Sequence, residues 1–107
     1  QKICDIAAAP HFTYRDKDVF DMAFLEWDNT ARYREKATIY KGCTPPIFEK
    51  NFRRLVQKAE QKPEGRRFVY INAWNEWAEG TYLEPDEKNG YGSLEAVQRV
   101  MRERTQD

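Results

Sequence analysis

The sequence predicts an α/β fold with parallel strands, and three observations support this prediction. Two apolar runs, residues 19–25 and 67–73, contain the aromatic and β-branched residues typical of strands. Between the runs, apolar residues from Phe48 onward recur at the helical period. A strand, a helix and a second strand in this order form a β-α-β unit, in which the two strands run parallel.

The second run is expected to be buried on both faces. Residues 68–71 (Phe-Val-Tyr-Ile) follow one another without polar alternation, which is typical of a strand covered on both sides. The first eighteen residues give the weakest pattern, because Pro10 interrupts an alanine-rich stretch. His11 is the single histidine of the chain, and we assign it no role.

Two amphipathic helices are expected. Thr44 has the side chain of an N-cap residue, and Pro45 suits the first helical position. This helix ends near the Lys-Pro-Glu-Gly sequence at 62–65. Its apolar face consists of Phe48, Phe52, Leu55, Val56 and Ala59. A last helix runs from Ser93 to about Arg104. Its apolar face consists of Leu94, Val97, Val100 and Met101.

Tryptophan and acidic residues follow the end of each predicted strand. After the first strand come Trp27, Asp28 and Asn29. After the second strand come Trp74, Asn75, Glu76, Trp77 and Glu79. Ligands of parallel α/β sheets bind at the carboxyl ends of the strands, so we expect the two groups to converge. Flat indole rings and carboxylates suit the C–H face and the hydroxyls of a pyranose, so the sequence predicts a sugar site.

Glu76 and Glu79 are the candidate catalytic residues. In a helical turn they stand at i and i+3, with Cβ atoms about 5–6 Å apart. Two carboxylates this close repel each other, so one is expected to hold its proton above the usual Glu pKa of about 4.3. Retaining glycosidases keep their two carboxyl groups about 5–5.5 Å apart. The alternative is a pair of solvated side chains on an exposed helix face, which is the commoner role of such pairs.

At this point the residues carry a resemblance to a known family. Residues 75–80 (Asn-Glu-Trp-Ala-Glu-Gly), with Leu-Glu-Pro-Asp at 83–86 and Gly-Tyr at 90–91, resemble the C-terminal signature of glycoside hydrolase family 99-like proteins. These include the WbsX-type proteins of bacterial lipopolysaccharide and O-antigen synthesis. Residues 27–32 (Trp-Asp-Asn-Thr-Ala-Arg) are similar to a stretch that WbsX-like proteins carry upstream of the Glu pair. The resemblance covers nearly the whole chain, about residues 20–100.

The resemblance implies a fold and two catalytic roles. The fold is a (β/α)8 (TIM) barrel, of which this chain would supply C-terminal β/α units. Glu76 matches the base that takes the proton of the sugar 2-hydroxyl, so that this oxygen displaces the leaving group through an anhydro-sugar intermediate. Glu79 matches the general acid/base that protonates the departing oxygen and then activates water. Substrates in the hydrolase branch of the family are α-mannosides.

Eight residues are candidates for substrate binding, and several of them have alternative roles. They are Trp27, Asp28, Asn29, Arg32, Trp74, Asn75, Trp77 and Glu84. The Asp-Asn-Thr sequence at 28–30 could instead form an Asx turn or a helix cap. Arg32 could pair with a carboxylate or with a phosphate of a nucleotide-linked or lipid-linked sugar. Glu84 could bind a sugar hydroxyl or accept backbone N–H groups of its loop. We expect residues 86–88 to be solvated.

Length limits what this chain does alone. A complete (β/α)8 barrel needs about 250 residues, so 107 residues supply only about three of the eight units. Residues 1–107 are therefore a single small domain or a fragment, and Gln1 in place of Met fits a fragment or a processed chain. The function expected is glycosyl hydrolysis or transfer in bacterial surface polysaccharide metabolism, on an oligosaccharide or glycan substrate. The alternative is a non-catalytic sugar-binding or structural remnant of that fold.

Composition excludes several other classes of function. Eighteen basic and eighteen acidic residues cancel, so a nucleic-acid partner is not expected. No apolar run has the length of a membrane span and no signal peptide is visible, so we expect a cytoplasmic location. No cluster has ligand spacing, so neither a metal nor a cofactor is predicted. Cys4 and Cys43 are expected to be two buried thiols rather than a disulfide. The oligomeric state stays open.

Overall fold

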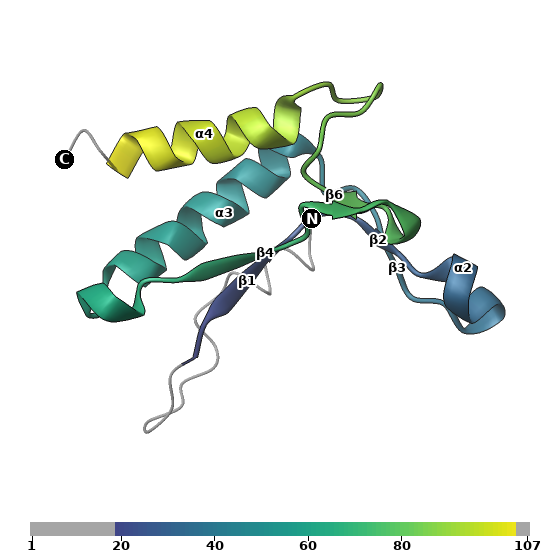
Figure 1. Cartoon of the computed structure of the whole chain (residues 1–107), viewed down its shortest axis with the longest axis horizontal. Coiled ribbons are helices and arrows are strands. Elements are labelled where there is room, and N and C mark those ends of the chain that lie inside the picture. The colour runs from purple at the N-terminus through teal and green to yellow at the C-terminus, as the bar shows by residue number, and fades with distance from the viewer. Residues whose placement is uncertain (1–18, 105–107) are drawn as a thin grey trace.

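Two helices pack on one side of a two-stranded parallel sheet (Figure 1). The computed structural model describes residues 19–104, so Cys4 and His11 lie outside the described residues. The sheet consists of β1 (Asp21–Phe24) and β4 (Val69–Asn72). Helix α3 (Pro45–Glu60) lies against this sheet, and helix α4 (Gly92–Arg104) lies beside α3.

The strand register confirms the predicted β-α-β unit. Asp21 pairs with Val69, and the pairing runs in parallel to Phe24 and Asn72. Both strands are shorter than the apolar runs that predict them, because only four residues of each find a partner on the other strand. The sequence patterns therefore locate both strands correctly and place their ends too far out.

The core lies between the helices and the sheet. Thr44 takes the extended backbone of an N-cap residue and Pro45 begins α3, as predicted, although Thr44 makes no side-chain capping bond. All five residues of the predicted apolar face of α3 are buried, and the rings of Phe48 and Phe52 stack at 5.6 Å. The other buried hydrophobic side chains of this cluster are Ala23, Leu25, Cys43, Leu83, Ala96 and Val100. The Cys43 thiol donates a hydrogen bond to the carbonyl of Phe24 at 3.4 Å.

Helix α4 departs from its predicted apolar face at one residue. Ala96 and Val100 are buried, while Leu94 and Val97 are partly buried against the same core. Met101 is 40% exposed, contrary to prediction. It follows Val100 directly and so lies about 100° further round the helix, away from α3.

Within residues 19–104, no helix or strand covers the opposite face of the sheet. In β4, Val69 and Ile71 pack against the core, but Tyr70 is 58% exposed, so the expected burial on both faces is wrong for this strand. Met22, which pairs with Tyr70 on β1, is 40% exposed. The physical reason is that α3 and α4 lie on the same side of the sheet. The ring of Phe20 contacts that of Tyr70 edge-on, with centroids 6.3 Å apart. Apolar and aromatic side chains therefore line this face.

A small arm leaves the end of β1. It contains β2 (Trp27–Asp28), α2 (Thr30–Tyr33), a 3-10 turn η1 (Arg34–Lys36) and β3 (Ile39–Tyr40), and we call residues 27–40 the α2 arm. Strands β2 and β3 pair antiparallel. The α2 arm projects away from the helices (Figure 1).

A short hairpin leaves the end of β4, which follows the 3-10 turn η2 (Glu64–Arg66). It contains β5 (Asn75–Glu76), the 3-10 turn η3 (Trp77–Glu79) and β6 (Thr81–Tyr82), and we call residues 75–82 the carboxylate hairpin. The chain then runs through a loop into α4.

Candidate functional site

The α2 arm and the carboxylate hairpin begin side by side. Strands β1 and β4 are parallel neighbours, so their carboxyl ends share one edge of the sheet. Just beyond that edge, the backbone N–H of Leu25 donates to the carbonyl of Asn72 at 3.4 Å. The convergence expected from the sequence is therefore present, at the edge where α/β proteins bind ligands.

Glu76 and Glu79 lie on different pieces of backbone. Glu76 belongs to β5 and pairs with Thr81, whereas only residues 77–79 form the helical turn. The expected helical turn is present only as this short 3-10 turn, with Glu76 at its N-cap, and the chain then reverses at Gly80, with φ of 65°, and returns alongside β5. The predicted separation of the two carboxylates stays a prediction.

Thr81 fixes the carboxylate hairpin to the sheet. Its side chain is fully buried, with 1% of the residue exposed, and its hydroxyl donates to the carbonyl of Asn72 at 2.6 Å. Asn72 is the last residue of β4. The hairpin that carries both glutamates is thus tied directly to the strand end.

Glu79 is a buried carboxylate with a cationic partner. It is 8% exposed, and its Oε1 lies 3.6 Å from Nη1 of Arg32 in the α2 arm. Of the two roles considered for Arg32, pairing with a carboxylate is the one present. The ion pair joins the two motifs that converge at the strand ends. Glu76 is only half-buried, so the two carboxylates have different surroundings.

Trp77 is held by two neighbours. Its indole Nε1–H donates to Oε1 of Glu84 at 2.9 Å. Its ring stacks on Tyr82, with centroids 3.7 Å apart and planes 10° apart. Trp77 nevertheless stays 49% exposed. The Glu84 carboxylate thus accepts from an indole rather than from backbone N–H groups of its loop, and sugar binding by Glu84 stays a prediction.

Asp86 organises the loop before α4. Its carboxylate accepts the Tyr82 hydroxyl at 2.7 Å and the backbone N–H of Asn89 at 2.7 Å. The hydrogen bond between the two side chains raises the pKa of Tyr82 to about 12 and lowers the pKa of Asp86 below its usual value. The expectation that Asp86 is simply solvated is therefore wrong, because the turn closed with Gly90 brings its side chain back to Tyr82 and Asn89.

Asp28 and Asn29 make local hydrogen bonds within the α2 arm. Asp28 Oδ1 accepts the hydroxyl of Thr30 and also its backbone N–H, the latter at 2.9 Å. These bonds hold the pKa of Asp28 below its usual value. Asn29 Oδ1 accepts the N–H of Thr38 at 2.8 Å and so closes the arm. This is the turn alternative that the sequence left open, and sugar binding by the two residues stays a prediction.

The remaining predicted binding residues differ in exposure. Trp74 is 58% exposed, and its carbonyl accepts the backbone N–H groups of Leu83 and Glu84. Asn75 is exposed at the start of β5. Trp27 is half-buried on β2, where it pairs with Tyr40. Two indole rings, those of Trp74 and Trp77, are therefore available on the surface around the carboxylate hairpin.

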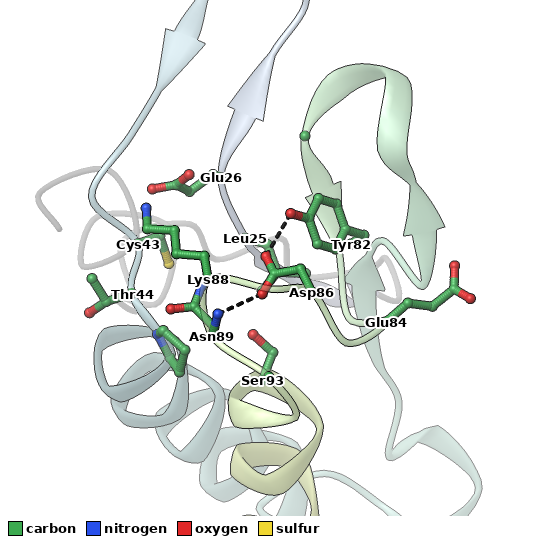
Figure 2. Close-up of a pocket in the computed structure, with 13 residues that line it drawn as sticks. Leu25, Glu26, Cys43, Thr44, Tyr82, Glu84, Asp86, Lys88, Asn89 and Ser93 are labelled. Carbon is green, nitrogen blue, oxygen red and sulfur yellow. Dashed lines mark hydrogen bonds between the residues drawn. The ribbon is translucent and has the colours of Figure 1, made fainter.

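A small pocket lies beside Tyr82 and Asp86 (Figure 2). Its volume is about 80 Å³, which is room for about two or three water molecules and less than a ligand pocket of ordinary size. Neither Glu76 nor Glu79 lines it. Its lining residues are Leu25, Glu26, Cys43, Thr44, Pro45, Gly80, Tyr82, Glu84, Asp86, Lys88, Asn89, Gly90 and Ser93.

Two negative findings concern residues 19–104 only. Within this range, no group of three or more His, Cys, Asp or Glu residues is arranged to hold a metal ion. In the same range, no helix has the length and apolar character needed to cross a membrane.

Three residues of the site were missed by the sequence reasoning. Tyr82, Asp86 and Thr81 support Trp77 and the carboxylate hairpin through the contacts given above. The available signal was Gly80 between two short polar segments, which is typical of a hairpin turn. A hairpin centred there places Tyr82 opposite Asn75.

Comparison with known proteins gives one family and two relatives. The sequence model of the family described as "Glycosyltransferase WbsX" matches residues 3–97. Two curated relatives, each called "Uncharacterized protein WxcX", come from Xanthomonas campestris pv. campestris strains B100 and ATCC 33913. Each is 42% identical over 88 residues, which cover 81% of this chain but only 13% of the relative. No solved structure matches this sequence.

Proposed function

Because this chain belongs to the family described as Glycosyltransferase WbsX, we propose that it is the carboxylate-bearing part of an enzyme that cleaves or transfers a glycosyl unit. The glycosyl unit would belong to a bacterial surface polysaccharide, as the WbsX-type resemblance implies. The observation that supports this best is the burial of the Glu79 side chain at a strand end, next to the half-exposed indole of Trp77. Buried ionisable groups in such positions are candidates for catalysis.

In the proposed reaction, the two glutamates act in sequence on the sugar. Glu76 takes the proton of the 2-hydroxyl, O2 attacks C1, and the leaving oxygen departs with the proton of Glu79. Glu79 then takes a proton from water, or from an acceptor hydroxyl in transfer, whose oxygen opens the anhydro ring at C1. Glu76 returns its proton to O2, so both carboxyl groups end as they began. General acid–base steps of this kind contribute roughly 10²–10⁴-fold each to the rate.

We also propose that the fold is a piece of a (β/α)8 barrel. In such barrels the helices cover the outer face of parallel strands, and side chains fill the inside. The pair β1 and β4 has helices on one face and the uncovered side chains of Met22 and Tyr70 on the other. The radius of gyration, 14.7 Å, exceeds the roughly 13 Å of a compact 100-residue domain. Further strands of the longer protein would then close over this face.

The test of the barrel is the unfolding of the 107-residue chain alone, followed by circular dichroism. A broad, non-cooperative transition is expected of a severed barrel piece. A sharp transition, as two-state domains give, would contradict the proposal.

The test of the catalytic pair uses the complete protein with mannose-containing oligosaccharides. Glu76→Gln and Glu79→Gln are each expected to lower turnover by roughly 10²-fold or more while leaving the unfolding curve unchanged. Glu64→Gln is the matched control, because Glu64 lies in η2, away from the carboxylate hairpin. Full activity in either site variant would overturn the assigned roles.

The second candidate function is sugar binding without catalysis. The exposed rings of Trp74 and Trp77 favour it, since stacking on a sugar needs no carboxylate chemistry. Under this alternative, both glutamine variants keep full affinity for the oligosaccharides, and the wild-type protein shows no turnover of them.

A further inference from the structure

We propose that Glu84, Tyr82 and Asp86 are positioning residues that hold the indole of Trp77 as a rigid stacking platform for a pyranoside. The inference rests on the function proposed above, because it concerns the sugar side of the same site. It assigns a role to the loop at 84–90, which carries none of the candidate catalytic groups.

Trp77 is restrained in two independent ways. The hydrogen bond to Glu84 fixes the indole N–H edge, and the stack on Tyr82 covers one ring face. An indole that is half exposed at a turn would otherwise exchange between rotamers. Ordering it before the sugar arrives removes part of the entropic cost of binding.

Tyr82, which stacks on Trp77, is itself held in place by the loop that follows it. The Tyr82 hydroxyl donates to Asp86, and Asp86 also accepts the N–H of Asn89 (Figure 2). The backbones of Asp86 and Gly90 exchange hydrogen bonds at 3.3 and 2.8 Å, which closes the loop. A chain of contacts therefore runs from the closed loop through Tyr82 to the ring of Trp77.

The indole of Trp77 lies on the same turn as Glu79. Trp77 begins the turn η3 that ends at Glu79, so the indole and the buried carboxylate share one short rigid segment. Since Tyr82 covers one face of the indole, the other face is the one available to a ligand. A flat aromatic face of this kind suits the C–H surface of a sugar ring. A pyranose stacked there lies beside the segment that carries Glu79.

The experiment is a double-mutant cycle in the complete protein, with an α-linked mannobiose as the probe and calorimetry as the measurement. Trp77→Ala is expected to weaken mannobiose binding roughly tenfold. Glu84→Ala is expected to weaken it about three- to tenfold, the loss given by one hydrogen bond. In the Trp77→Ala background, Glu84→Ala is expected to cause no further loss, because Glu84 acts only through the indole.

Further variants at Glu84 and Tyr82, and a control variant at Glu87, test the same inference. Glu84→Gln keeps an acceptor oxygen for the indole and should restore most of the affinity lost in Glu84→Ala. Tyr82→Phe keeps the stack and should bind more tightly than Tyr82→Leu, which removes it. Glu87→Gln, an exposed change in the same loop, should leave binding unaltered.

The outcomes separate this inference from the function on which it rests. If Trp77→Ala leaves mannobiose affinity unchanged, or if the wild-type protein binds none, the sugar-binding role itself fails. If Trp77→Ala weakens binding but the effects of Trp77→Ala and Glu84→Ala simply add, the sugar role stands and the positioning role is overturned.

Discussion

Two parts of this molecule are ordered by different kinds of contact. The layer of β1, β4, α3 and α4 contains most of the buried apolar residues. The α2 arm contains no fully buried residue, and the carboxylate hairpin buries only Glu79 and Thr81. Hydrogen bonds, one ion pair and one ring stack order these site segments. The comparison suggests that apolar burial positions the strand ends, and that polar contacts then position the chemistry.

The layer also has a polar seam between its two helices. Glu49 of α3 accepts hydrogen bonds from Arg53 at 3.0 Å and from Arg99 of α4 at 2.8 Å. Arg53 in turn bonds both carboxylate oxygens of Glu103, each at 2.8 Å. These four charges hold the surface of the helix pair in register above the apolar core.

The largest expected effect is that of a cavity in the layer. Phe48→Ala removes a ring that is 1% exposed and should lower the free energy of unfolding by about 3–5 kcal/mol. Ile39→Ala is the matched change in the α2 arm, where Ile39 is 49% exposed, and should cost about 0.5 kcal/mol or less. Urea unfolding of both variants in the complete protein measures the contrast. Similar losses would mean that the arm is part of the core.

A smaller effect is expected where the two parts join. Thr81→Val removes the hydroxyl that donates to Asn72, whose carbonyl still accepts from Leu25, and should cost about 0.5–1.5 kcal/mol. Thr81→Ser keeps the hydroxyl and should recover the hydrogen bond. The measurement is limited proteolysis of the carboxylate hairpin together with thermal unfolding. Cleavage unchanged in Thr81→Val would show that the hairpin needs no tie to β4.

The smallest effect concerns the polar seam and depends on pH. The hydrogen bonds from Arg99, and then from Arg53, lower the pKa of Glu49 from an ordinary 4.5 to about 2. Because the folded pKa is the lower one, the stabilisation is complete above about pH 4.5 and is lost as pH falls towards 2. Glu49→Gln should flatten that part of the stability profile. The free energy of unfolding of Glu49→Gln is measured with urea between pH 2 and 6. If it falls with acid as steeply as that of the unchanged protein, Glu49 is not the source of the pH dependence.

Periodicity was enough to predict most of the layer. The helical spacing of Phe48, Phe52 and Leu55 predicted a buried face because such a face depends on neighbours three and four residues away. The parallel pairing of β1 and β4 followed from the order of the elements. The exposure of Tyr70 did not follow, because an apolar run shows what can be buried and not what covers it.

The site was predictable in its composition but not in its contacts. The motif residues Glu79 and Trp77 could be chosen from the sequence, and their neighbours could not. The pairing of Glu76 with Thr81 depends on the positive φ of Gly80, which no apolar pattern records. The bond between Trp77 and Glu84 depends in turn on that hairpin being closed.

The bare face of β1 and β4 makes the isolated chain prone to self-association. The two strands form a two-stranded sheet, so within the described residues each also has an unpaired edge. An apolar face bounded by open edges is a template for pairing with another chain. At raised concentration these residues alone should therefore aggregate, whereas the complete protein, in which Met22 and Tyr70 would be covered, should stay dispersed. The surface that would line an interior in the complete protein promotes aggregation when it faces water.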